Sequence, residues 1–194
     1  MEKQTVPLLQ HFGFIRQPFD KNLPLKQLFV SKQIAQLFDQ LVHFLHRRGI
    51  ALITGEIGAG KSTAIRAFTE QLEKNTCDIA YIPDPTIGIR GILNSMAIQL
   101  NLEAGYFKWQ LTEKLKLAIE KNAYDFNKFT LLIIDEAQLL TTNHLEEIRL
   151  FTNFKIDSQT PMLLILSAQP DVTKTIHLNS MKALAQRINL RYHL

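Results

Sequence analysis

One stretch decides how this sequence is interpreted, and it reads Gly55-Glu56-Ile57-Gly58-Ala59-Gly60-Lys61-Ser62-Thr63. It fits the pattern G-x-x-x-x-G-K-[ST], in which the glycines let backbone N–H groups curl around phosphate oxygens. Lys61 is expected to reach the β- and γ-phosphates of a nucleoside triphosphate, and Ser62 is expected to ligate Mg²⁺. All nine residues therefore form the predicted nucleotide-binding loop.

The residues on either side of the loop agree with this interpretation. An apolar run at residues 50–54 precedes it and predicts a strand. Apolar side chains then recur at helical spacing, at Ala64, Ile65, Phe68 and Leu72. A strand, a glycine-rich loop and a helix in this order are the setting that the motif requires, and the positive end of the helix favours phosphate.

A pair of acids follows a second apolar run. Residues 131–134 predict a buried strand, and Asp135 and Glu136 come directly after it. Ligands of open α/β sheets bind at the carboxyl ends of strands. We expect Asp135 to hold the Mg²⁺ shell beside Ser62, and Glu136 to accept a proton from the water that attacks the γ-phosphate. The second carboxylate favours hydrolysis over phosphoryl transfer to a small molecule.

The composition fits one α/β domain in a reducing compartment. The chain has 194 residues, a formal net charge of +4 and one cysteine, so nucleic-acid contact is permitted but not required and no internal disulfide can form. The sequence starts without the apolar segment of a signal peptide, and no apolar run approaches the roughly 18 residues needed to span a bilayer. We therefore expect a cytoplasmic protein without membrane insertion.

Strand and helix patterns alternate along the chain. Strands are predicted at residues 50–54, 78–82, 131–134, 162–166 and 188–193. Helices are predicted at residues 31–48, directly after the loop, at 88–101, at 107–122, and from a cap at Asn143 with Glu146 through 154. This alternation predicts a mostly parallel five-stranded sheet with helices on both faces, in a single domain over 31–194 preceded by an irregular arm over 1–30.

The order of these motifs resembles the AAA+ core of P-loop NTPases. Two further motifs extend the likeness: Ser167-Ala168-Gln169-Pro170 after a strand, and Leu184-Ala185-Gln186-Arg187 before the last strand. More narrowly, the chain is similar to a group that includes the type A general-secretion ATPases and the TniB-like or Mu B-like partners of transposases. The resemblance covers nearly the whole chain.

This resemblance implies roles that spacing alone does not give. It implies that Gln169, or failing that Ser167, is the sensor between the strand of the acids and the γ-phosphate. It also implies that Arg187 is an arginine finger, supplied in trans to a neighbouring subunit of an ATP-dependent homo-oligomer. Related proteins usually continue into a small helical lid with a second sensing arginine, whereas this sequence stops at Leu194. We expect an AAA+ core from which the lid is absent, either because the sequence is trimmed or because the protein lacks it.

The expected function is that of an ATPase whose ATP-bound state is a switch. Subunits would assemble with ATP on double-stranded DNA and recruit or license a transposase, and hydrolysis to ADP would dismantle the assembly. Non-specific contacts to DNA phosphates are expected from Thr86, Arg90 and Lys108. One alternative is the core of a secretion-pathway type A ATPase that acts on protein partners. Another is a P-loop kinase for a small molecule, although no arginine-bearing lid segment is evident.

Overall fold

The computed structural model describes residues 5–15, 17, 24, 27, 29–73, 75–154 and 160–194. The chain forms two units, Met1–Ser31 and Lys32–Leu194. The first unit contains helix α1 (Thr5–Phe12), where the sequence predicted irregular backbone. Gly13 ends this helix with a φ of 66°, and the N–H of Phe14 returns to the carbonyl of Leu9 at 2.9 Å, as in a glycine-terminated helix. Much of the remaining arm lies outside the described residues.

The second unit is built on a parallel sheet. Its strands are β1 (Gly49–Thr54), β2 (Cys77–Ile82), β3 (Phe129–Ile134), β4 (Met162–Ala168) and β5 (Ile188–His193). They lie in the order β2-β3-β4-β1-β5, and every neighbouring pair is parallel. The predicted five-stranded sheet is therefore confirmed, with all four pairings parallel.

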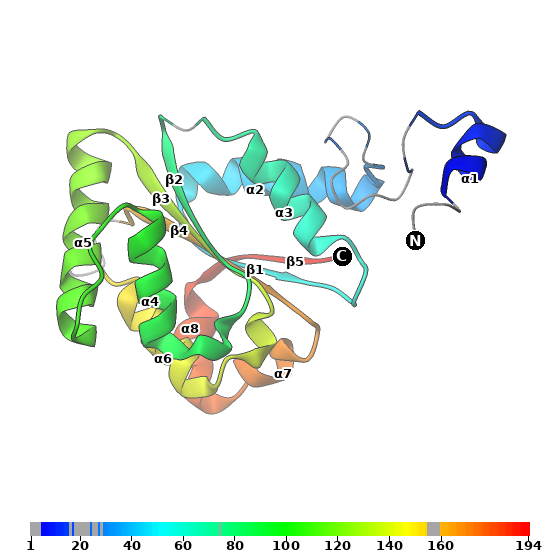
Figure 1. The fold of residues 1–194 in the computed structure, drawn as a ribbon. Helices are drawn as coiled ribbons and strands as arrows, with labels where there is room; N and C mark the ends of the chain where they lie inside the picture. The colour runs from blue at the N-terminus through cyan, green and yellow to red at the C-terminus, as the bar shows by residue number, and fades with distance from the viewer. Residues whose placement is uncertain are drawn as a thin grey trace. The chain divides into compact units, whose positions relative to one another are not determined.

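Helices cover both faces of this sheet (Figure 1). Helices α2 (Lys32–Arg47) and α3 (Lys61–Glu70) pack on one face. The other face is covered by α4 (Gly88–Gln99), α5 (Lys108–Asp125), α6 (Thr142–Phe151), α7 (Val172–Ile176) and α8 (Lys182–Arg187). In β4, Leu163 and Ile165 pack with α2 and α3, whereas Leu164 and Leu166 pack on the opposite side. Burial on both faces explains the apolar runs at residues 131–134 in β3 and 162–166 in β4.

The start of α6 differs from the prediction. The helix begins at Thr142, and the cap is Thr141, whose side-chain hydroxyl accepts the N–H of His144 at 3.2 Å. Thr141 has extended backbone angles, which place its hydroxyl over the first turn. The predicted cap at Asn143 is therefore wrong by two residues, because an equally good capping side chain stands earlier in the same polar run.

The parallel arrangement gives the sheet two distinct edges. We call the edge at which the strands end the carboxyl edge, and the edge at which they begin the amino edge. The nucleotide-binding loop follows β1 and the acid pair follows β3, so both lie at the carboxyl edge. Arg187 immediately precedes β5 and therefore lies at the amino edge.

Candidate nucleotide-binding site

The loop between β1 and α3 has the backbone that its glycines predict. Gly58 and Gly60 have φ values of 81° and 94°, a region that glycine enters without strain. Gly60 is the N-cap of α3 and offers no side chain to the first helical N–H groups. No side chain caps the first N–H groups of α3, which lie at the carboxyl edge. A phosphate could accept hydrogen bonds from them there.

Lys61 folds back over the start of the loop. Its ammonium group donates to the carbonyl oxygens of Gly55 at 2.7 Å and Glu56 at 3.0 Å. The side chain is nearly buried, with 8% exposure. An ammonium group has three donors, so two of them hold the lysine on the loop and one remains to reach a ligand.

A hydrogen bond joins the loop to the acid strand. The hydroxyl of Ser62 donates to Oδ2 of Asp135 at 3.0 Å, and Asp135 is only 5% exposed. A serine that donates its single proton keeps both oxygen lone pairs for a metal ion. Mg²⁺ prefers such oxygen ligands and usually binds through one or two protein groups plus substrate phosphates, so these residues fit the ion. No described group of three or more His, Cys, Asp or Glu side chains could hold a metal instead.

Tyr81, in β2, also contacts Asp135, and the sequence analysis missed it. Its hydroxyl donates to the same Oδ2 atom at 3.0 Å. Burial raises the pKa of Tyr81 to about 12, and the charge of Asp135, its hydrogen bond and the charge of Glu136 act in the same direction. The hydroxyl is thus protonated at neutral pH and able to donate. This contact could be predicted only from the order of the strands. Tyr81 pairs with Ile133 and therefore lies diagonal to Asp135.

Gln138 joins Glu136 to the end of β4, and it too was not predicted. It lies in the short 3-10 helix η4 (Ala137–Leu139). Its amide nitrogen donates to the carboxylate of Glu136, and its amide oxygen accepts the backbone N–H of Gln169 at 3.0 Å. Glu136 has a φ of 50°, which is uncommon for a residue with a side chain. The predicted base and the predicted sensor segment are therefore connected through one side chain.

The two alternatives for the sensor differ in their surroundings. Ser167 is fully buried, and its hydroxyl has no hydrogen-bond partner among the described residues. The register pairs Ile134 with Leu166, which places Ser167 beside Asp135 on the next strand. Gln169 follows β4 and meets Gln138 through its backbone. The structure thus brings both alternatives to the carboxyl edge, with Ser167 beside the acid strand.

Arg187 lies far from the loop of its own chain. It ends α8, and its guanidinium group donates to the side-chain oxygen of Asn153. The six residues of β1 separate this amino edge from the loop, and the five steps between them span roughly 17 Å at about 3.3 Å per step. Arg187 therefore cannot reach a nucleotide on the loop of the same subunit.

The residues expected to contact DNA are engaged within the protein. Arg90 donates to the carbonyl of Tyr106 at 2.8 Å and lies over its ring, and Lys108 pairs with Glu147. Thr86 donates both its N–H and its hydroxyl to the carboxylate of Asp84. These contacts leave the DNA prediction without support from the local geometry.

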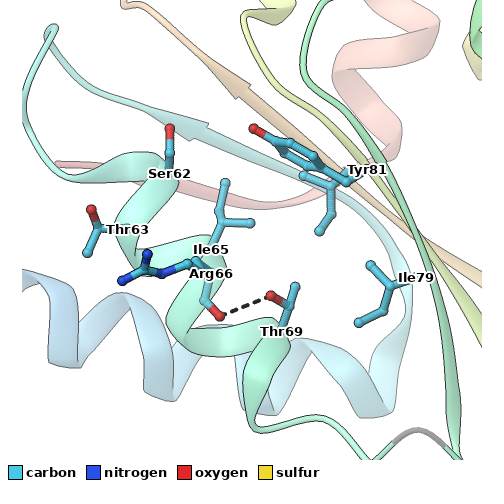
Figure 2. A pocket seen from close by; sticks show the side chains of 8 residues that line it. Ser62, Thr63, Ile65, Arg66, Thr69, Ile79 and Tyr81 are labelled. Carbon is cyan, nitrogen blue, oxygen red and sulfur yellow. Dashed lines mark hydrogen bonds between the residues drawn. The ribbon is translucent and has the colours of Figure 1, made fainter. Parts of the chain in front are cut away.

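A cavity of about 360 Å³ opens beside Ser62 and Tyr81 (Figure 2). It lies between α3 and the strands β2 and β3. Its lining is Ser62, Thr63, Ile65, Arg66, Thr69, Ile79, Tyr81 and Ile133. The hydroxyls of Ser62 and Tyr81 lie at the same end of this cavity, in agreement with their shared contact to Asp135 (Figure 2).

Several known proteins are similar to this chain. General secretion pathway protein A of Aeromonas hydrophila is 31% identical over 194 positions, which cover 95% of this chain and 34% of that protein. Among solved structures, the ORC2 protein of Aeropyrum pernix has a TM-score of 0.70 and 19% identity, over 92% of this chain and 51% of that one. Cdc6p of Pyrobaculum aerophilum has a TM-score of 0.63 and 19% identity, over 90% and 48%. The chain thus spans about a third of the curated relative and about half of each structure.

The family is shown by a profile match. The profile of the AAA domain matches residues 42–176, which is more than half of the chain. This region contains the nucleotide-binding loop, the acid pair and Gln169. The fold similarity to the solved structures agrees with it. The chain therefore belongs to the AAA domain family, with the fold of a P-loop NTPase.

Proposed function

We propose that this protein binds ATP with Mg²⁺ and hydrolyses it to ADP and phosphate. The observation that carries the proposal is the hydrogen bond between Ser62 and Asp135. It joins the phosphate-binding loop to the acid strand, so that the two motifs predicted from separate parts of the sequence form one site. Had the acids lain at the amino edge, the two motifs could not have served one nucleotide.

Each residue then has a role in the reaction. The loop N–H groups and Lys61 bind the phosphates; Ser62 and Asp135 would hold Mg²⁺, which would neutralise charge on the phosphate oxygens. Water attacks the γ-phosphorus, the bond to the β–γ bridging oxygen breaks, and ADP leaves. Glu136 accepts the proton that the attacking water loses. Gln169 or Ser167 senses the γ-phosphate from the end of β4.

Arg187 completes the site of another subunit. A finger at the amino edge can serve a nucleotide only when the amino edge of one copy meets the carboxyl edge of the next. Release of Arg187 from Asn153 would accompany that contact. The ATP-bound protein would then form a homo-oligomer, and hydrolysis would weaken it, which is the behaviour of a switch.

The partner on which such a switch acts is a separate question. The similarity to General secretion pathway protein A favours the core of a secretion-type ATPase that acts on protein partners. Assembly on double-stranded DNA and recruitment of a transposase stays a prediction from the motif order. No helix among the described residues is long and apolar enough to cross a membrane.

Binding and turnover assays test the proposal. Binding of a fluorescent ATP analogue is measured with Mg²⁺ or with EDTA, and phosphate release is measured with and without duplex DNA. We expect Mg²⁺-dependent binding and slow release of phosphate. Stimulation by DNA would support the predicted role in transposition, and transfer of the phosphoryl group to a small acceptor would support the kinase alternative. Absence of triphosphate binding under all conditions would overturn the proposal.

A further inference from the structure

Three hydrogen bonds within the protein hold the carboxylate of Asp135. Its Oδ1 atom accepts the N–H of Glu136 at 3.0 Å, and its Oδ2 atom accepts the hydroxyls of Ser62 and Tyr81, each at 3.0 Å. A carboxylate has about four acceptor positions. One position, on Oδ1, therefore remains, and the plane of the carboxylate is fixed from three directions.

The backbone of Tyr81 is also held in place by hydrogen bonds. Tyr81 lies on β2, the outermost strand of the sheet, whose backbone groups lack a neighbouring strand on one side. Gln99, at the end of α4, replaces that strand: its amide oxygen accepts the N–H of Tyr81 at 2.8 Å, and its amide nitrogen donates to the carbonyl of Tyr81 at 3.0 Å. This two-point contact fixes the position from which the ring reaches Asp135.

The ring of Tyr81 contributes to one wall of the 360 Å³ cavity beside α3, while its hydroxyl points to the metal-binding residues (Figure 2). Removal of the hydroxyl alone would leave the ring in place. The contact to Asp135 can therefore be tested separately from the packing of the strand.

We propose that Tyr81 is a positioning residue for the metal site, and that its hydroxyl lowers the Mg²⁺ concentration that nucleotide binding requires by holding Asp135 in place. This inference rests on the proposed function, because it assigns Asp135 to the Mg²⁺ shell. Groups that orient a metal ligand typically change metal affinity by 10- to 100-fold when they are removed. Gln99 supports the same role one step further from the metal.

Titration of Mg²⁺ against nucleotide binding tests the inference. Fluorescence anisotropy of a bound ATP analogue is followed as Mg²⁺ is added to metal-free protein. In Tyr81→Phe, the Mg²⁺ concentration at half-saturation should rise about tenfold, whereas nucleotide affinity in EDTA should stay within about twofold of the original. Gln99→Ala should give a smaller rise, about threefold. Tyr106→Phe, before α5, is the matched control and should leave the titration unchanged.

A double-mutant cycle separates positioning from general damage. In an Asp135→Asn background, Tyr81→Phe should add no further change, because the carboxylate that Tyr81 orients is gone. An unchanged or lower Mg²⁺ requirement in Tyr81→Phe overturns the inference, as does an equal loss of affinity in EDTA. These results leave the proposed function intact, which instead fails if the original protein binds no nucleotide.

Discussion

The two edges of the sheet differ in how complete they are. At the carboxyl edge, Ser62, Tyr81 and Asp135 form one hydrogen-bonded group, and Gln138 joins Glu136 to the segment after β4. At the amino edge, the predicted functional group is Arg187 alone, held by the side chain of Asn153. The carboxyl edge thus has a connected group of polar side chains, whereas the amino edge has one predicted functional cation, Arg187.

Under the proposed function, one subunit carries two unlike halves of a site. On this proposal, the carboxyl edge would bind nucleotide by itself, because the loop, Lys61 and the residues proposed to hold Mg²⁺ all come from one chain. Hydrolysis at full rate would need an arginine that its own chain cannot deliver across the length of β1. Variants at the two edges should therefore affect binding and turnover differently.

Lys61→Ala should have the largest effect, because it removes the ammonium group from the phosphate site. We expect nucleotide affinity to fall by at least about a hundredfold and turnover to be lost with it. Binding is measured by anisotropy of a fluorescent ATP analogue. Lys114→Ala, an exposed change on α5, should bind as the original protein does. Normal affinity in Lys61→Ala would remove the loop from the nucleotide site.

Arg187→Ala should distinguish the role of the amino edge from that of the carboxyl edge. The affinity of the single subunit for nucleotide should be unchanged, while ATP turnover by the assembled protein should fall by about a thousandfold. Arg191→Ala, on the following strand, is the control. Mixing Arg187→Ala with Lys61→Ala subunits should restore part of the activity, because the first keeps its loop and the second keeps its arginine. Failure of the mixture to recover, with both variants shown to associate, would contradict action in trans.

Glu136→Gln should stop chemistry while binding persists. The amide has nearly the same shape but accepts no proton from water, so phosphate release should fall by about a hundredfold or more. The ATP-bound assembly should accumulate, which size-exclusion chromatography with ATP would detect. Glu113→Gln on α5 provides the control. Ordinary turnover in Glu136→Gln would mean that another group serves as base.

Gln138→Ala should have the smallest effect of this series. Loss of the link between Glu136 and Gln169 should change turnover by several-fold, with nucleotide affinity nearly unchanged. Steady-state phosphate release across ATP concentrations would show a change in kcat with constant KM. Gln36→Ala, exposed on α2, is the comparison. A change confined to KM would place Gln138 in binding instead.

The features that could be predicted are those that depend on a short stretch of chain. The loop carries its own glycines, and the strand before Asp135 carries its own apolar run, so both were found from sequence and confirmed as elements of the fold. Tyr81 and Gln138 were not found, because their partners come from other elements. The contact of Tyr81 with Asp135 requires β2 to lie next to β3, and sequence order alone did not establish that neighbour. The cap at Thr141 was missed because two polar residues two positions apart compete for the same role.

The backbone of Glu136 has a consequence for how this protein can change. A left-handed conformation with a full side chain typically costs on the order of 1 kcal/mol, and glycine at this position would avoid that cost. Glu136→Gly would relieve this strain, yet it would discard the carboxylate on which hydrolysis is proposed to depend and the contact of that carboxylate with Gln138. Relief of backbone strain and retention of turnover would therefore make opposite demands on this position.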